Sequence, residues 1–291
     1  MSSGTALRAF YRLKPLIPRP VQVGLRRVRA RRIWDGLGHD CRPPIPSDPL
    51  GYPWPDGHRA AAIITHDVEL EGGQRNVGAL AEIEAELGIR SCWNFVVRRY
   101  PVDTALIARL RADGHEVGVH GVHHDGHLFD SREIFVQRLE VMRDAARRWG
   151  ADGFRSPSLL YDRHLLAELP FGWDSSMPAW DPFQPQPGGC RRFTPFALNE
   201  RCIELPVTLW QDFILLEELR MTDVGVWRTQ VEFLHAIGGL INVIVHPDYI
   251  ATPARLALYR ELLQCITARP RTWIALPSEV ADWERRRHAV S

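Results

Sequence analysis

The feature that most constrains the fold is a regular alternation of short apolar runs and amphipathic segments from residue 60 to residue 280. Such apolar runs are typical of buried parallel strands, and the amphipathic segments have the apolar spacing of helices. Alternation of this kind indicates a parallel sheet covered by helices, either open or closed into a barrel. The expected strands lie at residues 61–65, 91–97, 115–120, 153–155, 171–174, 202–207, 240–245 and 272–276, and the expected helices at 76–87, 104–112, 131–149, 223–237 and 255–268.

We therefore divide the chain into two parts. Residues 58–291 form the α/β domain, and residues 1–57 form a basic helical arm followed by a connector rich in Pro and Gly. The first 34 residues contain nine Arg or Lys and no Asp or Glu. Two short helices are expected there, at residues 6–13 and 21–33, because the proline-rich stretch between them breaks helical structure.

The second helix of the arm leaves two interpretations open. Val21, Leu25 and Val28 line one face, and arginines occupy the others. The helix either lies on an anionic membrane, with each basic residue contributing about 1 kcal/mol, or packs its apolar face on the domain with the arginines in solvent. A membrane contact would involve residues 6–33. A nucleic-acid partner has only the charge to support it and is not expected.

Cellular location is predicted from what the sequence contains. The five cysteines are scattered and form no Cys-x-x-Cys pair, which favours a reducing compartment. No apolar run approaches the ~20 residues needed to span a bilayer. The N-terminus also lacks the apolar core of a secretion signal. We expect a cytoplasmic protein, with a peripheral contact at the inner face of the membrane as the variant that the basic arm suggests.

Polar side chains of versatile chemistry follow the predicted strands at the point where each strand ends. They are Asp67 and Glu69, His120, Arg155, Asp174 and His246. In parallel α/β barrels the carboxyl ends of the strands form one face, and active sites are built on that face. The placement predicts a single site.

Two histidines of this set have a spacing that suits a metal ion. His120 and His124 face the same way if one helical turn follows the strand, and His123 is an alternative to His124. Asp67 and Glu69 are two positions apart, so on an extended backbone both carboxylates point to the same side. One carboxylate can bind a metal while the other acts as a base, which is typical of a catalytic rather than a structural site.

Four motifs then carry a resemblance to a known family. Thr65-His-Asp-Val-Glu69, His120-Gly-Val-His-His124, Arg155-Ser-Pro157 and Val245-His-Pro247 resemble, in order and spacing, the motifs of the NodB-homology polysaccharide deacetylases, a family of carbohydrate esterase type. The resemblance covers roughly residues 60–280. It implies a distorted (β/α) barrel, here preceded by the helical arm, and metal-dependent hydrolysis of N-acetyl groups on sugars.

The resemblance also implies roles for individual residues. Asp67 matches the catalytic base and Arg155 the residue that holds it. His120 and His124 match the metal ligands, and His246 matches the general acid. The family commonly has two adjacent aspartates, whereas this chain has Val68 and then Glu69, an Asp-x-Glu variant in which either carboxylate could bind the metal.

Further expectations concern the surroundings of the site. Asp174 is a candidate partner of His246, and Trp180 and Trp210 are candidate walls for a sugar ring. One divalent ion is expected, with Zn²⁺ first and Co, Mn or Ni also compatible with these ligands.

The expected function is N-deacetylation of an amino sugar in an intracellular nucleotide- or lipid-linked glycan precursor. One alternative is deformylation, or hydrolysis of another C–N bond, at the same site. The other is a non-catalytic carbohydrate-binding protein with a degraded site. The sequence does not indicate the oligomeric state.

Overall fold

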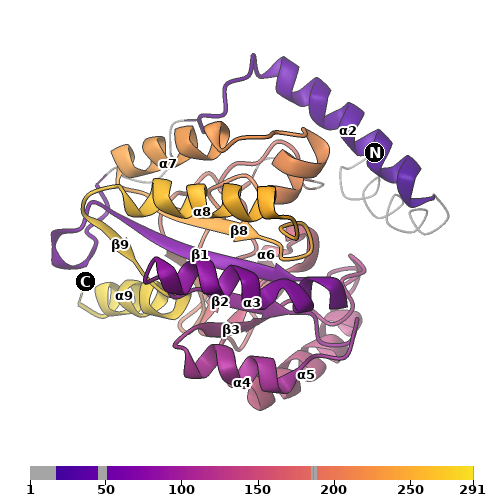
Figure 1. Cartoon of the computed structure of the whole chain (residues 1–291). Helices are drawn as coiled ribbons and strands as arrows, with labels where there is room; N and C mark the ends of the chain where they lie inside the picture. Colours follow the sequence, from indigo (N-terminus) through magenta and orange to yellow (C-terminus); the bar gives the residue numbers. More distant parts are fainter. Residues whose placement is uncertain (1–17, 45–50, 185, 187–188, 291) are drawn as a thin grey trace.

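The computed structural model describes residues 18–44, 51–184, 186 and 189–290, and Figure 1 shows the chain. The strands are β1 (Ala60–Val68), β2 (Cys92–Phe95), β3 (Glu116–Val119), β4 (Gly153–Phe154), β5 (Trp173–Asp174), β6 (Phe196–Ala197), β7 (Ile203–Glu204), β8 (Leu240–Val245) and β9 (Thr272–Ile274). The α-helices are α2 (Arg19–Gly36), α3 (Glu71–Glu86), α4 (Thr104–Ala112), α5 (Arg132–Trp149), α6 (Arg163–Leu166), α7 (Gly225–Ile237), α8 (Pro253–Thr267) and α9 (Pro277–Val290). Short helical turns lie at η2 (Pro55–Gly57), η3 (Pro157–Leu159) and η4 (Phe213–Glu218), the last of which is a π-helix.

The strands form one curled sheet in the order β6-β7-β5-β4-β3-β2-β1-β8, and β9 pairs with the first residues of β1. All pairs along this path are parallel except β6 with β7. The sheet curls round so that the segment after β7 reaches β8: Leu209 N donates to Asn242 O, and Asn242 Nδ2 donates to Leu205 O. The fold is therefore a distorted (β/α) barrel.

The central strand β1 is buried along its whole length, so its side chains alternate between the inside of the barrel and the surrounding helices. Ala61 and Ile63 pack inside, in an apolar cluster with Trp173 of β5. Ala62 and Ile64 pack outside, in the larger cluster beneath the helices. Each fully buried isoleucine contributes about 1.5–3 kcal/mol to stability. The inside face becomes polar only towards the carboxyl end of the strand, where the motif residues begin.

The observed elements agree with the expected alternation, with differences at their ends. Strand β1 continues to Val68, so Asp67 lies within the strand rather than after it. Helix α5 begins after Ser131, whose hydroxyl accepts a hydrogen bond from Ile134 N as expected of a capping residue. Elements β6, α6, α9 and the short helical turns η2, η3 and η4 were not expected, and the predicted helix at residues 6–13 lies outside the described residues.

The arm packs on the barrel through helix α2. Its Trp34 and the connector residue Trp54 are buried in the apolar clusters of the domain. Val21, Leu25 and Val28 are nevertheless exposed, so the interpretation in which this apolar face packs on the domain is wrong. The division of the chain between residues 57 and 58 stays a prediction. In the described part of the chain, no helix combines the length and the apolarity needed to cross a membrane.

Candidate metal centre and active site

The motif residues meet at the carboxyl ends of neighbouring strands. Thr65 and Asp67 point into the barrel from β1, and Glu69 follows the strand on the same side because side chains alternate with a period of two. His120 follows β3 directly, and Arg155 follows β4. The single site predicted from the strand ends is therefore present as a group of adjacent side chains.

Glu69, His120 and His124 form a cluster in which one ligand atom from each lies within 4.8 Å of the others. Glu69 Oε1 is 2.7 Å from His124 Nε2 and 3.7 Å from His246 Nε2. The imidazole ring centroids of His120 and His124 are 5.0 Å apart. His123, the alternative to His124, is exposed and does not belong to this cluster.

The tautomer of His120 is fixed by its backbone partner. Its Nδ1 lies 3.0 Å from the carbonyl oxygen of Arg155, and a carbonyl oxygen only accepts, so Nδ1 carries the proton. The Nε2 atom therefore presents its lone pair to the cluster, where it is buried and has no hydrogen-bond partner. Burial lowers the pKa of His120 to about 4, although the negative charge of Asp67 acts in the opposite direction. His120 is accordingly neutral and able to act as a ligand at neutral pH.

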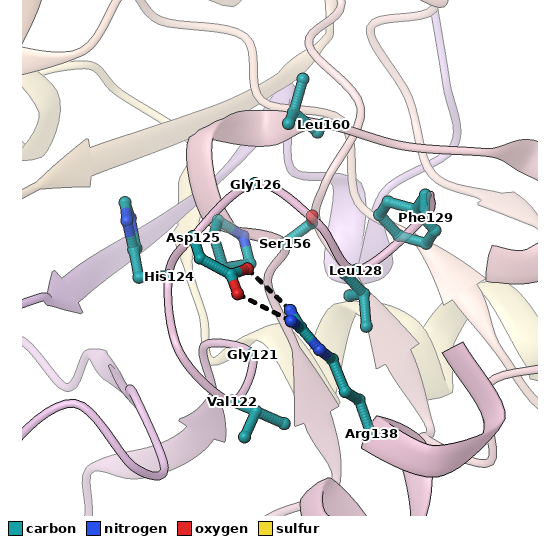
Figure 2. A pocket seen from close by; sticks show the side chains of 11 residues that line it. Gly121, Val122, His124, Asp125, Gly126, Leu128, Phe129, Arg138, Ser156 and Leu160 are labelled. Carbon is teal, nitrogen blue, oxygen red and sulfur yellow. Dashed lines mark hydrogen bonds and ion pairs between the residues drawn. The ribbon is translucent and has the colours of Figure 1, made fainter. Parts of the chain in front are cut away.

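The loop that carries His124 is held on both of its sides. His124 has a φ of 53°, a left-handed conformation that costs about 1–2 kcal/mol in a non-glycine residue. Asp125 accepts two hydrogen bonds of 2.7 Å from the guanidinium group of Arg138 on α5. Figure 2 shows this pair on one side of the loop and His124 on the other. Gly121 also has a positive φ, and a Cβ atom there would lie 2.7 Å from Pro157 Cγ, so the loop packs tightly on the third motif.

Asp67 is buried among donors and positive charges. Asn94 Nδ2 donates to its Oδ1 at 3.0 Å, and Arg155 Nη1 lies 3.6 Å from its Oδ2. Burial by itself would raise the pKa of Asp67, but its electrostatic interactions with the His120 ring, Arg155 and His246 outweigh that penalty and lower the pKa below its ordinary value. Asp67 is therefore ionised, as a general base must be.

Asn94 was not singled out from the sequence, although it lies in the expected strand at residues 91–97. It pairs directly with Asp67 in the register of β1 and β2. Room for its side chain comes from Gly118 of β3, where a Cβ atom would be 2.0 Å from Asn94 Oδ1. Strand alternation could have placed Asn94 on the inside of the barrel. The register between the two strands was needed to place it beside Asp67.

His246 is held by Asp212, a second residue that the sequence did not reveal. Asp212 accepts hydrogen bonds from the backbone N–H of His246 at 2.7 Å and from its ring Nδ1 at 2.6 Å. Burial opposes protonation of His246, but the charge and hydrogen bond of Asp212 outweigh it, with help from Glu69 and Asp67, and raise the pKa to about 10. The only hint in the sequence was an acidic residue soon after the expected strand at 202–207.

The expected pairing of Asp174 with His246 is corrected by this geometry. Asp174 lies opposite Glu204 in the register of β5 and β7, and its Oδ1 accepts a hydrogen bond of 2.5 Å from Ser176. Burial raises the pKa of Asp174, and burial together with the charge of Asp174 raises that of Glu204 well above its ordinary value. The protonated form of this carboxyl pair is therefore favoured within the barrel wall, away from His246.

The aromatic residues proposed as walls for a sugar also need a correction. Trp210 has no exposed surface and packs against Trp34 of the arm and Phe183, with ring centroids 5.8 and 4.9 Å away. It is therefore a core residue and cannot touch a ligand. Trp180 is partly buried beside it, at 5.3 Å, and its contact with substrate stays a prediction.

The cluster fits a divalent metal of the zinc type. Two imidazoles and one carboxylate converge, and the Nε2 atoms of both histidines are buried without a hydrogen-bond partner. The 2.7 Å between His124 Nε2 and Glu69 Oε1 brings two candidate ligand atoms to one point. Three protein ligands leave coordination positions open for water or substrate.

Comparisons with known proteins agree with this architecture. Neither models of protein families nor the curated proteins yielded a match. Solved structures did. One described as a polysaccharide deacetylase from Mycobacterium smegmatis has a TM-score of 0.67 and 22% identity, covering 84% of this chain and 96% of its own. A second, described as a Puue allantoinase, has a TM-score of 0.67 and 16% identity, covering 84% and 99%.

A third structure, described as a polysaccharide deacetylase from Pseudomonas aeruginosa PAO1, has a TM-score of 0.62 and 17% identity, covering 83% of this chain and 95% of its own. At these identities the likeness establishes the fold. It extends over most of the chain and over nearly the whole of each neighbour. The chain therefore has the distorted (β/α) barrel fold of the NodB-homology polysaccharide deacetylases.

Proposed function

We propose that the protein is a metal-dependent hydrolase that removes an N-acetyl group from an amino sugar. The observation that carries the proposal is the convergence of Glu69, His120 and His124 on one point, with Asp67 and His246 beside it. A degraded, non-catalytic site would not be expected to keep both a complete ligand set and two proton-transfer groups of opposite protonation state. The Asp-x-Glu variant is compatible with this chemistry, because Asp67 and Glu69 share one side of the backbone.

We infer different tasks for the two carboxylates. Glu69, with the two histidines, would hold the metal, which supplies a lowered pKa for bound water and polarisation of the amide carbonyl. Asp67 is held instead by Asn94 and Arg155, and it is the group placed to accept the proton of the attacking water. Arg155 keeps this carboxylate charged and oriented through Nη1. Its Nη2 donates hydrogen bonds of 3.0 Å to the hydroxyl groups of Thr65 and Ser175.

His246 is the group placed to protonate the departing amine. Its Nδ1 is committed to Asp212, so the N–H of Nε2 faces the cluster. A histidine whose pKa is raised to about 10 carries that proton at neutral pH. General acids of this kind typically contribute a factor of ~10²–10⁴ to the rate.

The substrate proposed is an amino-sugar residue of an intracellular nucleotide- or lipid-linked glycan precursor. The basic arm supports the lipid-linked form, because a protein held at an anionic membrane meets such a substrate directly. A second candidate is hydrolysis of another C–N bond, including deformylation, at the same site. The likeness to a structure described as an allantoinase supports keeping it, because the same barrel then serves different C–N bonds.

The test combines metal analysis with product analysis. Purified protein is expected to contain about one Zn²⁺ or similar ion per chain and to release acetate from N-acetylated sugar nucleotides. Chelation should abolish the release and Zn²⁺ should restore it. Release of formate from N-formyl sugars without acetate release would select the second candidate.

Variants connect the reaction to the site. Asp67→Asn should lower kcat by a factor of ~10²–10⁴ while leaving the metal content unchanged. Asp144→Asn, on the exposed face of α5, is the matched control and should behave as the parent does. A purified protein that binds no metal would contradict the proposal. So would a parent protein that hydrolyses no amide and binds sugars no differently from Asp67→Asn.

A further inference from the structure

The outer face of α2 carries an apolar surface that the proposed reaction does not use. Val21, Leu25 and Val28 are 50%, 61% and 51% exposed and lie on one side of the helix, four and three residues apart. Among the described residues, the other large apolar side chain exposed to this degree is Val136 of α5, at 44%. Three such side chains on a single helix face form a patch, which we call the outer stripe, whereas Val136 stands alone.

Helix α2 packs on the barrel through the buried Ala30 and Trp34 and through hydrogen bonds of two arginines, while the outer stripe points away from the barrel. Arg27 Nε donates to Glu217 O at 2.9 Å, and Arg29 Nη1 donates to Phe183 O at 2.6 Å. Burial of apolar surface is the main driving force for packing a helix on its own domain, and the outer stripe is a second apolar face that this packing leaves in solvent. An outward stripe is therefore expected to be covered by something other than the barrel.

The charge around the outer stripe selects an anionic partner. The helix contains six arginines and a single acidic residue, Asp35, near its end. Arg32 lies on the side of Leu25, two helical turns on, and both Arg31 and Arg32 are exposed. A second copy of the chain would place two arginine-rich helices against each other. A nucleic acid would bind the arginines through its phosphates but would leave the outer stripe in water.

An anionic membrane satisfies both features at once. Arginines reach lipid phosphates while apolar side chains enter the boundary between headgroups and acyl chains, as in interfacial helices. Residues 35–291 contain 27 basic and 35 acidic residues, so an anionic surface would repel the body and attract only the arm. The contact would therefore have a defined orientation.

The outer stripe lies on a helix beside the rim of the candidate site. The Arg26 guanidinium lies 5.6 Å from the ring centroid of Phe213, at the start of η4. The ring centroid of Phe213 is 5.1 Å from that of Tyr249, and the ring centroid of Tyr249 is 5.5 Å from that of His246. Figure 1 shows α2 at the periphery of the fold, outside the other helices, and the side chains of the outer stripe are exposed there.

We propose that the outer stripe and the arginines around it dock the protein on an anionic membrane, with the rim of the site beside the lipid. A lipid-linked substrate would then reach the site from the surface, a consequence that rests on the proposed function. The docking itself is independent of that function and is tested without any substrate.

The test is co-sedimentation of the full-length protein with vesicles of phosphatidylcholine, alone or mixed with phosphatidylglycerol. We expect binding to the mixed vesicles only, weakening as salt is added because the charges are screened. Leu25→Gln should weaken partitioning about tenfold through lost apolar burial, and Arg32→Gln about fivefold. Both side chains are exposed, so unchanged circular dichroism is expected and checks the fold.

Two matched controls locate the effect. Val136→Gln removes an exposed apolar side chain elsewhere, and Arg147→Gln removes an exposed arginine of α5; neither should change partitioning. Equal binding to both kinds of vesicle, or no loss in Leu25→Gln, would overturn the proposal. So would a dimer in sedimentation velocity that Leu25→Gln dissociates, or duplex RNA binding that needs Arg32 but not Leu25. Because no reaction is measured, a failed deacetylase assay has no bearing on the outcome.

Discussion

At the residue scale, two histidines of the site are held through the same ring atom but by partners of different charge. His120 donates a hydrogen bond from Nδ1 to the neutral carbonyl of Arg155, and His246 donates one from Nδ1 to the carboxylate of Asp212. Burial then lowers the pKa of His120 to about 4, whereas Asp212 outweighs burial and raises that of His246 to about 10. One imidazole is thereby suited to donate a lone pair and the other to donate a proton, which is how similar groups are divided between roles.

The role of Asp212 leads to the first residue-scale prediction. Asp212→Asn keeps a carbonyl oxygen for the backbone N–H of His246 but removes the charge that holds the ring protonated. We expect kcat and kcat/KM to fall together by a factor of ~10²–10³, because the proton is delivered in the transition state while substrate binding is unaffected. Steady-state kinetics with an N-acetyl amino sugar measures the split.

Asp174→Asn is the matched comparison for this prediction, because Asp174 was the partner expected from the sequence. Asp174 lies opposite Glu204 and accepts from Ser176 instead of contacting His246, so kcat should stay within about threefold of the parent. An equal loss of kcat in both variants would show that Asp212 acts through general stability rather than by positioning His246.

These residues also mark how far single positions can be predicted. Asp67, Glu69, His120, Arg155 and His246 were found from their places at strand ends and His124 from its spacing to His120, whereas Asn94 and Asp212 were not found. Asp174 and Asp212 could not be ranked, since both are aspartates close to such ends and only the register of β5 with β7 turns Asp174 towards Glu204. Trp210 could not be assigned to the core, because that depends on its contact with Trp34, far away in the chain.

At the element scale, the loop between β3 and α5 is positioned by the helix that follows it. The left-handed His124 and the tight packing of Gly121 on Pro157 bring the second and third motifs together. The loop has little regular structure of its own, so the ion pair between Asp125 and Arg138 ties it to α5. Supporting contacts of this kind orient metal ligands and affect affinity strongly.

The second prediction therefore concerns Arg138. Arg138→Met keeps the apolar stem of the side chain but removes the two hydrogen bonds to Asp125. We expect the affinity for Zn²⁺ to fall about 10–100-fold, measured by competition with a chelating indicator, while thermal stability changes little. Arg147→Met, on the exposed side of the same helix, should leave the affinity unchanged. If both variants bind Zn²⁺ as the parent does, the loop holds His124 without α5.

The helices and strands that could be predicted are those whose apolar residues follow the helical period of about 3.6 residues or form short buried apolar runs. Strands such as β1 and β8 are long and apolar, and α3 and α5 have clear apolar stripes, so all of them were expected. The two-residue strand β6 lies after a stretch rich in Pro and Gly and pairs antiparallel, and the π-helix η4 has its own spacing. Both depend on long-range packing that local patterns do not record.

At the scale of the whole molecule, the orientation of the arm is the feature that the sequence left undecided. An amphipathic helix with basic flanks has the same pattern whether its apolar face turns to a barrel or to a membrane. What decides the outcome is the barrel surface, where backbone carbonyls and Glu217 accept from the arginines of α2. That surface is assembled from segments that lie 154 and 190 residues further along the chain.

The same surface leads to a prediction for stability against pH. Burial raises the pKa of Glu218, on η4 beneath α2, to about 7 even though Arg26 and Arg29 act against it, and burial raises that of Asp181 to about 6. The folded chain then binds protons more tightly than the unfolded chain, whose carboxyl groups have pKa values of about 4. Stability from these groups is present below pH ~4 and is lost as the pH rises towards 7.

Glu218→Gln should remove part of this dependence, because an amide stays neutral at every pH. We expect the variant to gain about 1–3 kcal/mol relative to the parent between pH 4 and pH 7, measured as the free energy of urea unfolding at each pH. Glu140→Gln, exposed on α5, makes the same change in net charge and should give a curve parallel to the parent. A parent whose stability rises steadily over this range, with Glu218→Gln following it, would mean that Glu218 is ionised in the folded protein and pairs with the arginines of the arm. In that case α2 would be held to the barrel more tightly as the pH rises, the opposite of what a buried, protonated Glu218 implies.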